Sequence, residues 1–352
     1  LLGTAGGLFA LQASSLNEAI TPANVTVRRQ TTAAAADRLP VKIGRATLFV
    51  QRMGKKLLAA DYALDRDAYA AEDMSLLAHH LLREGIAAIV HQAEPHGIVW
   101  SVTEGGELLG LTYLAAQDVI AWHRHPLGGT DVAVLSVAAI PTEGQDELWL
   151  VVERSIDGQT VRTVERLTAP IAPVDENDKD DLFFVDCGLS YTGVPATEIS
   201  GLDHLEGETV SILADGAAHP DRVVTDGAVT LMRSASSVHV GLGYTSRLTT
   251  LDLNAGSAAG TALGKPTRVH AVTVRFLETL GAHAGFDADH LDPVLFRTGA
   301  SSMDASPPLY TGFKRIAFPK GWDRAARVHV TQNQPLPCTI TAIVPHVTTN
   351  EG

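Results

Sequence analysis

The sequence predicts an all-β protein, because apolar strand cores recur along its first half at near-regular distances. The cores are centred on Phe49, Trp100 and Trp149, so their spacings are 51 and 49 residues. A turn and a second apolar run follow each core, as in a β-hairpin. A repeat of about 40–50 residues made of short strands is typical of propeller blades. We therefore expect propeller-like blades over residues 1–170, a scaffold that specifies no chemistry by itself.

Local composition predicts the individual strands of this region. Each expected strand has β-branched or aromatic residues at its centre and Gly, Pro, Asp or Asn beyond its ends. These strands are Val25–Val27, Thr47–Gln51, Ile86–Val90, Ile98–Val102, Leu108–Tyr113, Val119–Trp122, Val132–Ile140, Glu147–Val152 and Thr160–Glu165. The chain opens on Leu1, without Met or a basic leader, and runs directly into a hairpin around Gly6 and Gly7. We therefore expect the first blade to be N-terminally incomplete.

One short helix is expected near residues 71–84. Apolar residues recur at helical spacing between Ala71 and Arg83, Asp73 lies near the start, and Gly85 follows the end. The apolar positions are Met74, Leu77, Ala78, Leu81 and Leu82. This segment would be the single helix in an otherwise all-β region.

Three further segments follow the blades. Residues 171–182 are rich in acidic side chains and follow a proline, which predicts a solvated linker. Residues 183–255 have shorter strands and denser turns, and we expect a small inserted β-barrel there. Residues 256–352 combine longer strands with proline-rich turns and predict a C-terminal antiparallel β region, or platform.

The composition is that of an ordinary globular protein. Of 352 residues, 45% are hydrophobic and 19% are charged. No apolar run approaches the roughly 18–20 residues that a membrane span needs, so we expect no membrane span. Cys187 and Cys338 lie far apart and form no CxxC motif, which suits a reducing compartment such as a cytoplasm.

Negative charge is concentrated in one region. The formal net charge is −13, and residues 131–200 alone carry 4 basic and 14 acidic side chains. Such a surface cannot release phosphate counterions, so it binds a DNA backbone poorly. It would instead repel DNA, which suits a surface past which DNA slides.

Trp122 precedes the most prominent polar cluster, His123 and His125. Alternate residues of a strand share a face, so the two histidines could both ligate zinc. No neighbouring motif supplies the third and fourth ligands that zinc needs. We favour the alternative, in which both histidines are polar residues at a strand end that pack against Trp122.

Other patterns of reactive residues are incomplete. The carboxylates of Asp175–Asp181 lack the glycine bend and distal glutamate of a calcium loop. Gly241–Ser246 begins like a dinucleotide loop, but no helix is expected after it. The phosphate-loop and nucleophile-elbow motifs do not occur. We predict no catalytic, cofactor-binding or metal-binding residue, no cofactor, and no enzymatic activity. The apolar loops Pro307–Tyr310 and Phe318–Trp322 either fill the chain's own core or make subunit contacts.

Nine segments distributed over nearly the whole chain carry a family resemblance. They are Ala13–Ala19, Val25–Gln30, Leu48–Arg52, Leu109–Tyr113, Trp122–His125, Asp146–Trp149, Val164–Leu167, Gly201–Gly207 and Gln334–Pro337. These segments resemble the tail nozzle proteins of short-tailed bacteriophages (podoviruses), also called tail tubular protein B or phage stabilisation proteins. The shared motifs are structural, so the resemblance implies no active site.

The resemblance implies a virion protein of the viral tail, assembled in the host cytoplasm. Its fold would be a β-propeller-like body with an inserted barrel and a platform. Six copies would form a ring that closes the portal-adaptor channel and conducts DNA during ejection, without sequence-specific binding. The expected partners are a tail adaptor ring, similar to tail tubular protein A, and tail fibres or spikes.

Two other functions remain open at this point. A carbohydrate-binding or carbohydrate-cleaving propeller at a host surface would use Trp100, Trp122 and Trp149 to stack on sugar rings. Each of them lies in an apolar strand core, which favours burial instead. A metalloenzyme would use His123 and His125.

Overall fold

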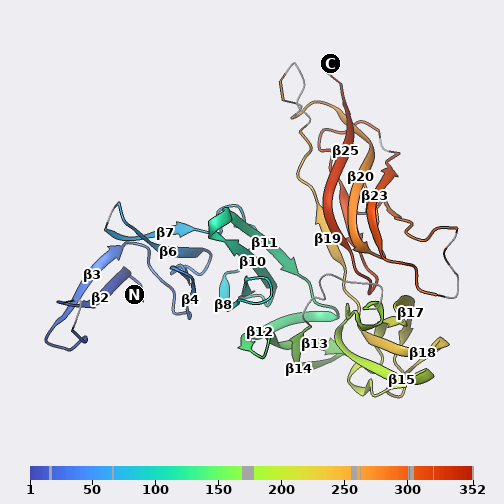
Figure 1. The fold of residues 1–352 in the computed structure, drawn as a ribbon, viewed down its shortest axis with the longest axis horizontal. Helices are drawn as coiled ribbons and strands as arrows, with labels where there is room; N and C mark the ends of the chain where they lie inside the picture. The colour runs from blue at the N-terminus through green and yellow to red at the C-terminus, as the bar shows by residue number, and fades with distance from the viewer. Residues whose placement is uncertain are drawn as a thin grey trace. The chain divides into compact units, whose positions relative to one another are not determined.

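The structure is a computed structural model, shown as a ribbon in Figure 1. It describes residues 1–15, 18–65, 67–168, 178–254, 260–261, 263–299, 301, 305–319 and 321–350. Strands make up 58% and helix 3%, and no helix in these ranges reaches seven residues, so the predicted all-β class is confirmed. The chain divides into two compact units, which we describe separately. Unit 1 comprises Leu1–His125, Asp131–Arg154 and Thr160–Ala169, and unit 2 comprises Pro126–Thr130, Ser155–Gln159 and Pro170–Gly352.

Unit 1 contains four antiparallel sheets, and in each of them the strands follow one another in chain order. The first sheet has β1 (Leu2–Thr4), β2 (Gly7–Ala13) and β3 (Val25–Thr31). The second has β4 (Val41–Ile43), β5 (Ala46–Val50), β6 (Leu57–Ala63) and β7 (Ala68–Asp73). The third has β8 (Ile86–Gln92), β9 (Ile98–Thr103), β10 (Leu108–Leu114) and β11 (Val119–His125), with the 3-10 turn η1 (Ala115–Gln117) before β11. The fourth has β12 (Thr130–Pro141), β13 (Asp146–Ile156) and β14 (Gln159–Leu167).

The recurring aromatic cores occupy equivalent places in these sheets. Phe49 lies in β5, Trp100 in β9 and Trp149 in β13, and each of these is the second strand of its sheet. The turn after each core leads into the third strand, as the sequence predicts. A meander of this kind is the strand order of a propeller blade. A closed ring of blades stays a prediction.

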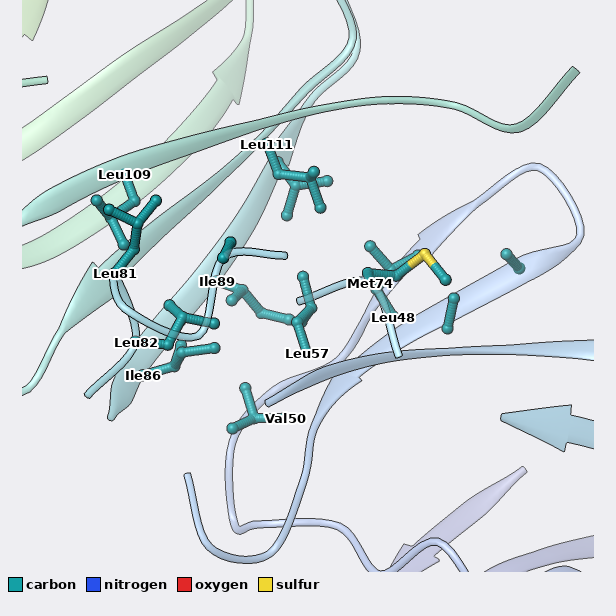
Figure 2. Close-up of a cluster of buried hydrophobic side chains, with 14 residues drawn as sticks. Leu48, Val50, Leu57, Met74, Leu81, Leu82, Ile86, Ile89, Leu109 and Leu111 are labelled. Atoms are coloured by element: carbon teal, nitrogen blue, oxygen red, sulfur yellow. The ribbon is translucent and has the colours of Figure 1, made fainter. Parts of the chain in front are cut away.

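The second and third sheets enclose a common apolar core (Figure 2). Leu48 and Leu57 from the second sheet and Leu109 from the third are fully buried in it. Burying one leucine side chain contributes about 1.5–3 kcal/mol. The other buried members are Ala46, Val50, Ala59, Met74, Ala78, Leu81, Leu82, Ile86, Ile89, Val99 and Leu111. The two meanders are therefore stabilised by packing against each other.

The expected helix near residues 71–84 is wrong. The structure continues β7 to Asp73 and then forms a series of turns up to Gly85. The backbone hydrogen bonds of this segment, such as Ala78 N–H to Ser75 O and Leu81 N–H to Ala78 O, join residues three apart. These turns bury Leu82 completely but leave Leu77 92% exposed. The apolar residues of this segment therefore have the spacing of a helix but lie in successive turns, which direct only some of their side chains into the core.

Polar contacts with β6 explain why the segment turns. The Asp73 carboxylate accepts hydrogen bonds from the Ser75 N–H and hydroxyl at 2.9 and 2.6 Å and from Lys56 Nζ at 2.7 Å. The Ser75 Oγ accepts the Leu57 N–H at 3.3 Å, and the Met74 N–H donates to the Leu57 carbonyl. These tertiary bonds tie the start of the segment to β6 and replace helical ones.

Unit 2 contains three antiparallel sheets. The first joins β15 (Asp186–Ser200), β18 (Ala228–Leu242), β16 (Thr209–Ala214) and β17 (Ala217–Val223) in that order. The second joins β19 (Ser246–Thr249), β24 (His329–Gln332), β21 (His283–Gly285) and β22 (Leu291–Pro293). The third joins β23 (Tyr310–Ala317), β20 (Thr267–Thr279) and β25 (Thr339–Thr349). Two 3-10 turns, η2 (Lys179–Asp181) and η3 (Asp203–Leu205), precede β15 and β16.

The small barrel expected at residues 183–255 is wrong, because its strands form an open sheet. Closure requires the first and last strands to bond to each other, but β15 and β17 remain the two edges. Five strands lie in this segment, β15 to β19, and β18 runs without interruption from Ala228 to Leu242.

The C-terminal region is a pair of packed sheets. The core-facing side chains of β20 are Val272, Val274 and Phe276, all fully buried. They pack against residues of the β19–β24–β21–β22 sheet, including Ala284 and Val330. The other face of the β23–β20–β25 sheet carries exposed side chains.

Some sequence predictions fall outside the described residues. They include Asp175–Asn177 in the linker, Leu16 and Asn17 in the first segment of the family resemblance, and Lys320 in the second apolar loop. Within the described ranges, no helix has the length and apolar character needed to cross a membrane.

Candidate functional site

The strongest candidate for a functional site is the histidine pair of β11, which strand register places beside Trp100. Trp100 pairs with Gly110, and Gly110 pairs with His123, so the three residues form one row across the sheet. A Cβ at Gly110 would lie 2.1 Å from Cε1 of His123. Glycine at this position therefore lets the imidazole lie over β10 and reach towards β9.

The two imidazoles bond to each other. Nδ1 of His123 lies 2.7 Å from Nε2 of His125, and Nε2 of His123 lies 3.2 Å from Oγ1 of Thr112. The ring of His125 packs edge-on against Trp100, with centroids 4.5 Å apart. Trp100 is 2% exposed, so the pair lies against a buried indole.

A second set of bonds joins this row to β13. The Trp100 indole N–H donates to Oε1 of Gln92 at 2.8 Å, and Nε2 of Gln92 donates to the Asp146 carbonyl at 2.7 Å. The Asp146 carboxylate also accepts the backbone N–H groups of Ala93 and Glu94. The hydrogen bonds of Trp100, Gln92 and Asp146 therefore join the sheet of the histidines to the sheet that contains β13.

Burial determines the protonation of the pair. Desolvation lowers the pKa of His123 below its ordinary value. Desolvation, with the charge of His123 as a smaller cause, lowers the pKa of His125 to about 4. Both rings are therefore neutral near pH 7, and one donates its N–H to the other.

This geometry is a packed hydrogen-bonded pair. Both nitrogens of His123 are engaged in hydrogen bonds. Among the described residues, no three His, Cys, Asp or Glu side chains gather in a way that could hold a metal ion. The favoured prediction placed the histidines against Trp122, whereas the structure packs their rings against Trp100.

The three tryptophans proposed for sugar stacking have internal partners. Trp100 is buried. Nε1 of Trp122 donates to the Met74 carbonyl at 2.8 Å, and Nε1 of Trp149 donates to Oε2 of Glu147 at 3.0 Å. Trp122 and Trp149 are partly buried. None of these indole N–H groups points to a ligand site.

The remaining sequence candidates have structural roles or lie at the surface. A Cβ at Gly241 would lie 2.6 Å from the Asp186 carbonyl, so the glycine permits close strand approach rather than phosphate binding. His79 and His80 are both exposed. Of the two apolar loops, Phe318 is buried in the C-terminal core and Trp322 is 49% exposed.

A cavity of about 290 Å³ in unit 2 contains a thiol and a phenol. Burial raises the pKa of Cys338 to about 11. Burial, with the charge of Asp186 as a smaller cause, raises the pKa of Tyr244 to about 12. Neither group ionises near neutral pH, so neither is an activated nucleophile.

Sequence reasoning missed the residues that complete the histidine cluster, namely Gln92, Gly110, Thr112 and Asp146. The signal for Gly110 is its position in the strand next to that of the histidines. That signal becomes specific only once the register is known.

No protein-family model matches the chain, and no curated protein matches its sequence.

Proposed function

We propose that the chain is a structural subunit of a bacteriophage tail nozzle. Six copies would form a ring that closes the portal-adaptor channel and conducts DNA during ejection. In this proposal the protein belongs to the virion tail and contacts a tail adaptor ring and tail fibres or spikes. It has no catalytic role.

The observation that carries the proposal concerns the polar residues in the segments that resemble nozzle proteins: they form hydrogen bonds and ion pairs within the fold. The Asp146 carboxylate binds the backbone of Ala93 and Glu94. Glu147 accepts a hydrogen bond from Arg166 at 2.7 Å, and Glu165 pairs with the buried Arg154. These side chains hold strands and sheets together, as expected of motifs that specify a scaffold rather than a reaction.

The repeated architecture also supports a structural role. Unit 1 is built from successive meanders, and the second strands of three of them contain Phe49, Trp100 and Trp149, of which Phe49 and Trp100 are buried. Arrays of this kind bury their cores between neighbouring units and present long surfaces for assembly. The acidic excess of residues 131–200 would limit adhesion of DNA that moves past it.

The experiment that tests the proposal is assembly with an adaptor. The protein would be expressed alone and together with the adaptor from the same phage, and its oligomers would be measured by native mass spectrometry and electron microscopy. We expect a closed ring of six copies seated on the adaptor ring. Adaptor from an unrelated phage is the control and should not be bound.

A protein that stays monomeric and never joins the adaptor would exclude the nozzle function. A ring that retains one DNA sequence in preference to others would contradict the proposed passive conduction.

A further inference from the structure

The outer face of the β23–β20–β25 sheet is basic and apolar, unlike the chain as a whole. Register places Arg275 of β20 beside Phe313 of β23. Arg315 of β23 and Val344 of β25 both pair with Thr273, one row further along the sheet. We call Arg275, Phe313, Arg315 and Val344 the basic face. Figure 1 shows β23, β20 and β25 side by side in the C-terminal part of the chain.

The positive charges of this face are not paired with carboxylates of the described residues. Within the described residues, neither Arg275 nor Arg315 forms a salt bridge, and the guanidinium of Arg275 lies over the Phe313 ring at 5.7 Å. Phe313 is 59% exposed and Val344 is 48% exposed. Exposed aromatic residues beside arginine are typical of the centres of protein interfaces. The face therefore has the composition of a protein-binding surface.

The chain itself carries a surface of complementary charge. Asp180 and Asp181 of η2 and Asp215, next to the end of β16, are all exposed. Burial, followed by the charge of Asp215, raises the pKa of Asp180, so these carboxylates share an electronegative environment. We call Asp180, Asp181 and Asp215 the acidic corner. A cation from outside the chain would relieve this repulsion.

The chain's own cations offset this repulsion only in part. The charges of Lys179 and His239 lower the pKa of Asp180 as smaller causes, and its net shift stays upward. Lys179 also donates a hydrogen bond to the Pro307 carbonyl. The acidic corner of a second copy therefore offers the basic face a partner surface that is rich in carboxylates.

We propose that the basic face of one copy docks on the acidic corner of the next copy, head to tail. Two different surfaces that meet in this way form a heterologous interface, which generates a closed ring or an open filament. The inference rests on the proposed ring-forming function, for which it names the contact between copies.

Charge reversal tests the interface directly. The double variant R275E/R315E would be compared with the wild type by analytical ultracentrifugation at low and high salt. We expect association to weaken by about 10-fold or more, because each reversal replaces attraction with repulsion. Wild-type association should also weaken as salt rises, because exposed ion pairs are screened. The matched control is R83E/R233E, which makes the same change in net charge at two exposed arginines outside the face.

A charge swap separates a lost contact from a lost fold. The variant D180K/D181K should also associate poorly alone. Mixed with R275E/R315E, it should restore association, because every basic surface then meets an acidic one around an alternating assembly. Both variants should keep the thermal melting temperature of the wild type.

Four results would overturn the inference: wild type that never self-associates, unchanged association of R275E/R315E, equal loss in R83E/R233E, or no rescue in the mixture. Protection of Arg275 and Arg315 by a single-stranded oligonucleotide in monomeric protein would assign the face to nucleic acid instead. A hexameric ring that persists in R275E/R315E would leave the nozzle function standing and reject this interface. Charge-dependent association without a ring on the adaptor would do the reverse.

Discussion

Nδ1 of His123 lies 2.7 Å from Nε2 of His125, and this bond exists only while at least one of the two rings is neutral. Protonation of both rings would place two N–H donors against each other beside a buried indole. The pair thus makes the stability of unit 1 sensitive to acid.

Stability should fall as the pH drops from about 6.5 to about 4. An unfolded histidine titrates near pH 6.5, whereas the pKa of His125 in the fold is lowered to about 4. The folded state therefore binds fewer protons in this window, and its stability is lost as the pH falls through it. One such group contributes about 3 kcal/mol over the window. Urea unfolding at pH 7.5, 5.5 and 4.5 measures the effect.

His125→Phe is the variant for this test. It keeps an aromatic ring against Trp100 and removes the titration, so the decline between pH 6.5 and 4 should become shallower even though stability at pH 7 is lower. His80→Gln, at an exposed site, should leave the pH profile unchanged. An unaltered decline in His125→Phe would contradict the assignment.

Gly110→Ala should destabilise the protein by about 1–3 kcal/mol, because overpacking forces neighbours out of place. The new Cβ would lie 2.1 Å from Cε1 of His123 and would push the imidazole off β10. Gly299→Ala is the matched control, since a Cβ there meets nothing within 4 Å. Thermal unfolding of both variants checks the prediction, and equal stabilities would show that the ring is free to move.

Leu82→Ala should cost about 2–5 kcal/mol, whereas Leu77→Ala should change stability by less than about 0.5 kcal/mol. Leu82 is fully buried and Leu77 is 92% exposed. Chemical denaturation of the two variants distinguishes the turns from an amphipathic helix, which would bury both residues on one face. Similar costs at the two positions would favour the helix.

Asp73→Asn should loosen residues 74–85 and lower stability by about 1–3 kcal/mol, because the neutral amide loses the ion pair with Lys56 and keeps only one acceptor oxygen. Hydrogen bonds from Lys56 and Ser75 lower the pKa of Asp73 to about 2, despite the opposing effect of burial. The carboxylate's contribution should therefore be lost as the pH falls from about 4 towards 2. Hydrogen exchange of the segment measures the loosening, and Glu72→Gln, at an exposed neighbouring site, is the control. Equal exchange in the two variants would contradict this role.

Strands that depend on local alternation of side chains could be predicted from the sequence. The cores at Phe49, Trp100 and Trp149 were predicted as strands, because alternating and β-branched residues identify a strand without knowledge of its partners. The segment Ala71–Arg83 was misread, since its apolar spacing fits a helix while the bonds of Asp73 and Ser75 with β6 are tertiary. Helix propensity depends on residues that are close in the sequence, so it does not include such bonds.

The register between paired strands explains the other differences. The histidine cluster depends on Gly110 lying opposite His123, and the basic face depends on the register of β20 with β23 and β25. Shifting a register by one residue would move every side chain to the opposite face. The barrel prediction failed for the same reason, because the sequence of an edge strand does not show whether that strand pairs with the opposite edge of the sheet.

The division of the chain has a consequence for dissecting the protein. The backbone passes between the two units five times, because 126–130 and 155–159 belong to unit 2 although their neighbours belong to unit 1. The Gly128 N–H donates to the Asp186 carboxylate at 2.7 Å, and the Asp157 N–H donates to Glu208 at 3.1 Å. A single cut near residue 170 would strip unit 2 of both donors and leave them stranded on the other fragment. Separate expression of the chain before and after this cut would therefore deprive unit 2 of two of its hydrogen bonds.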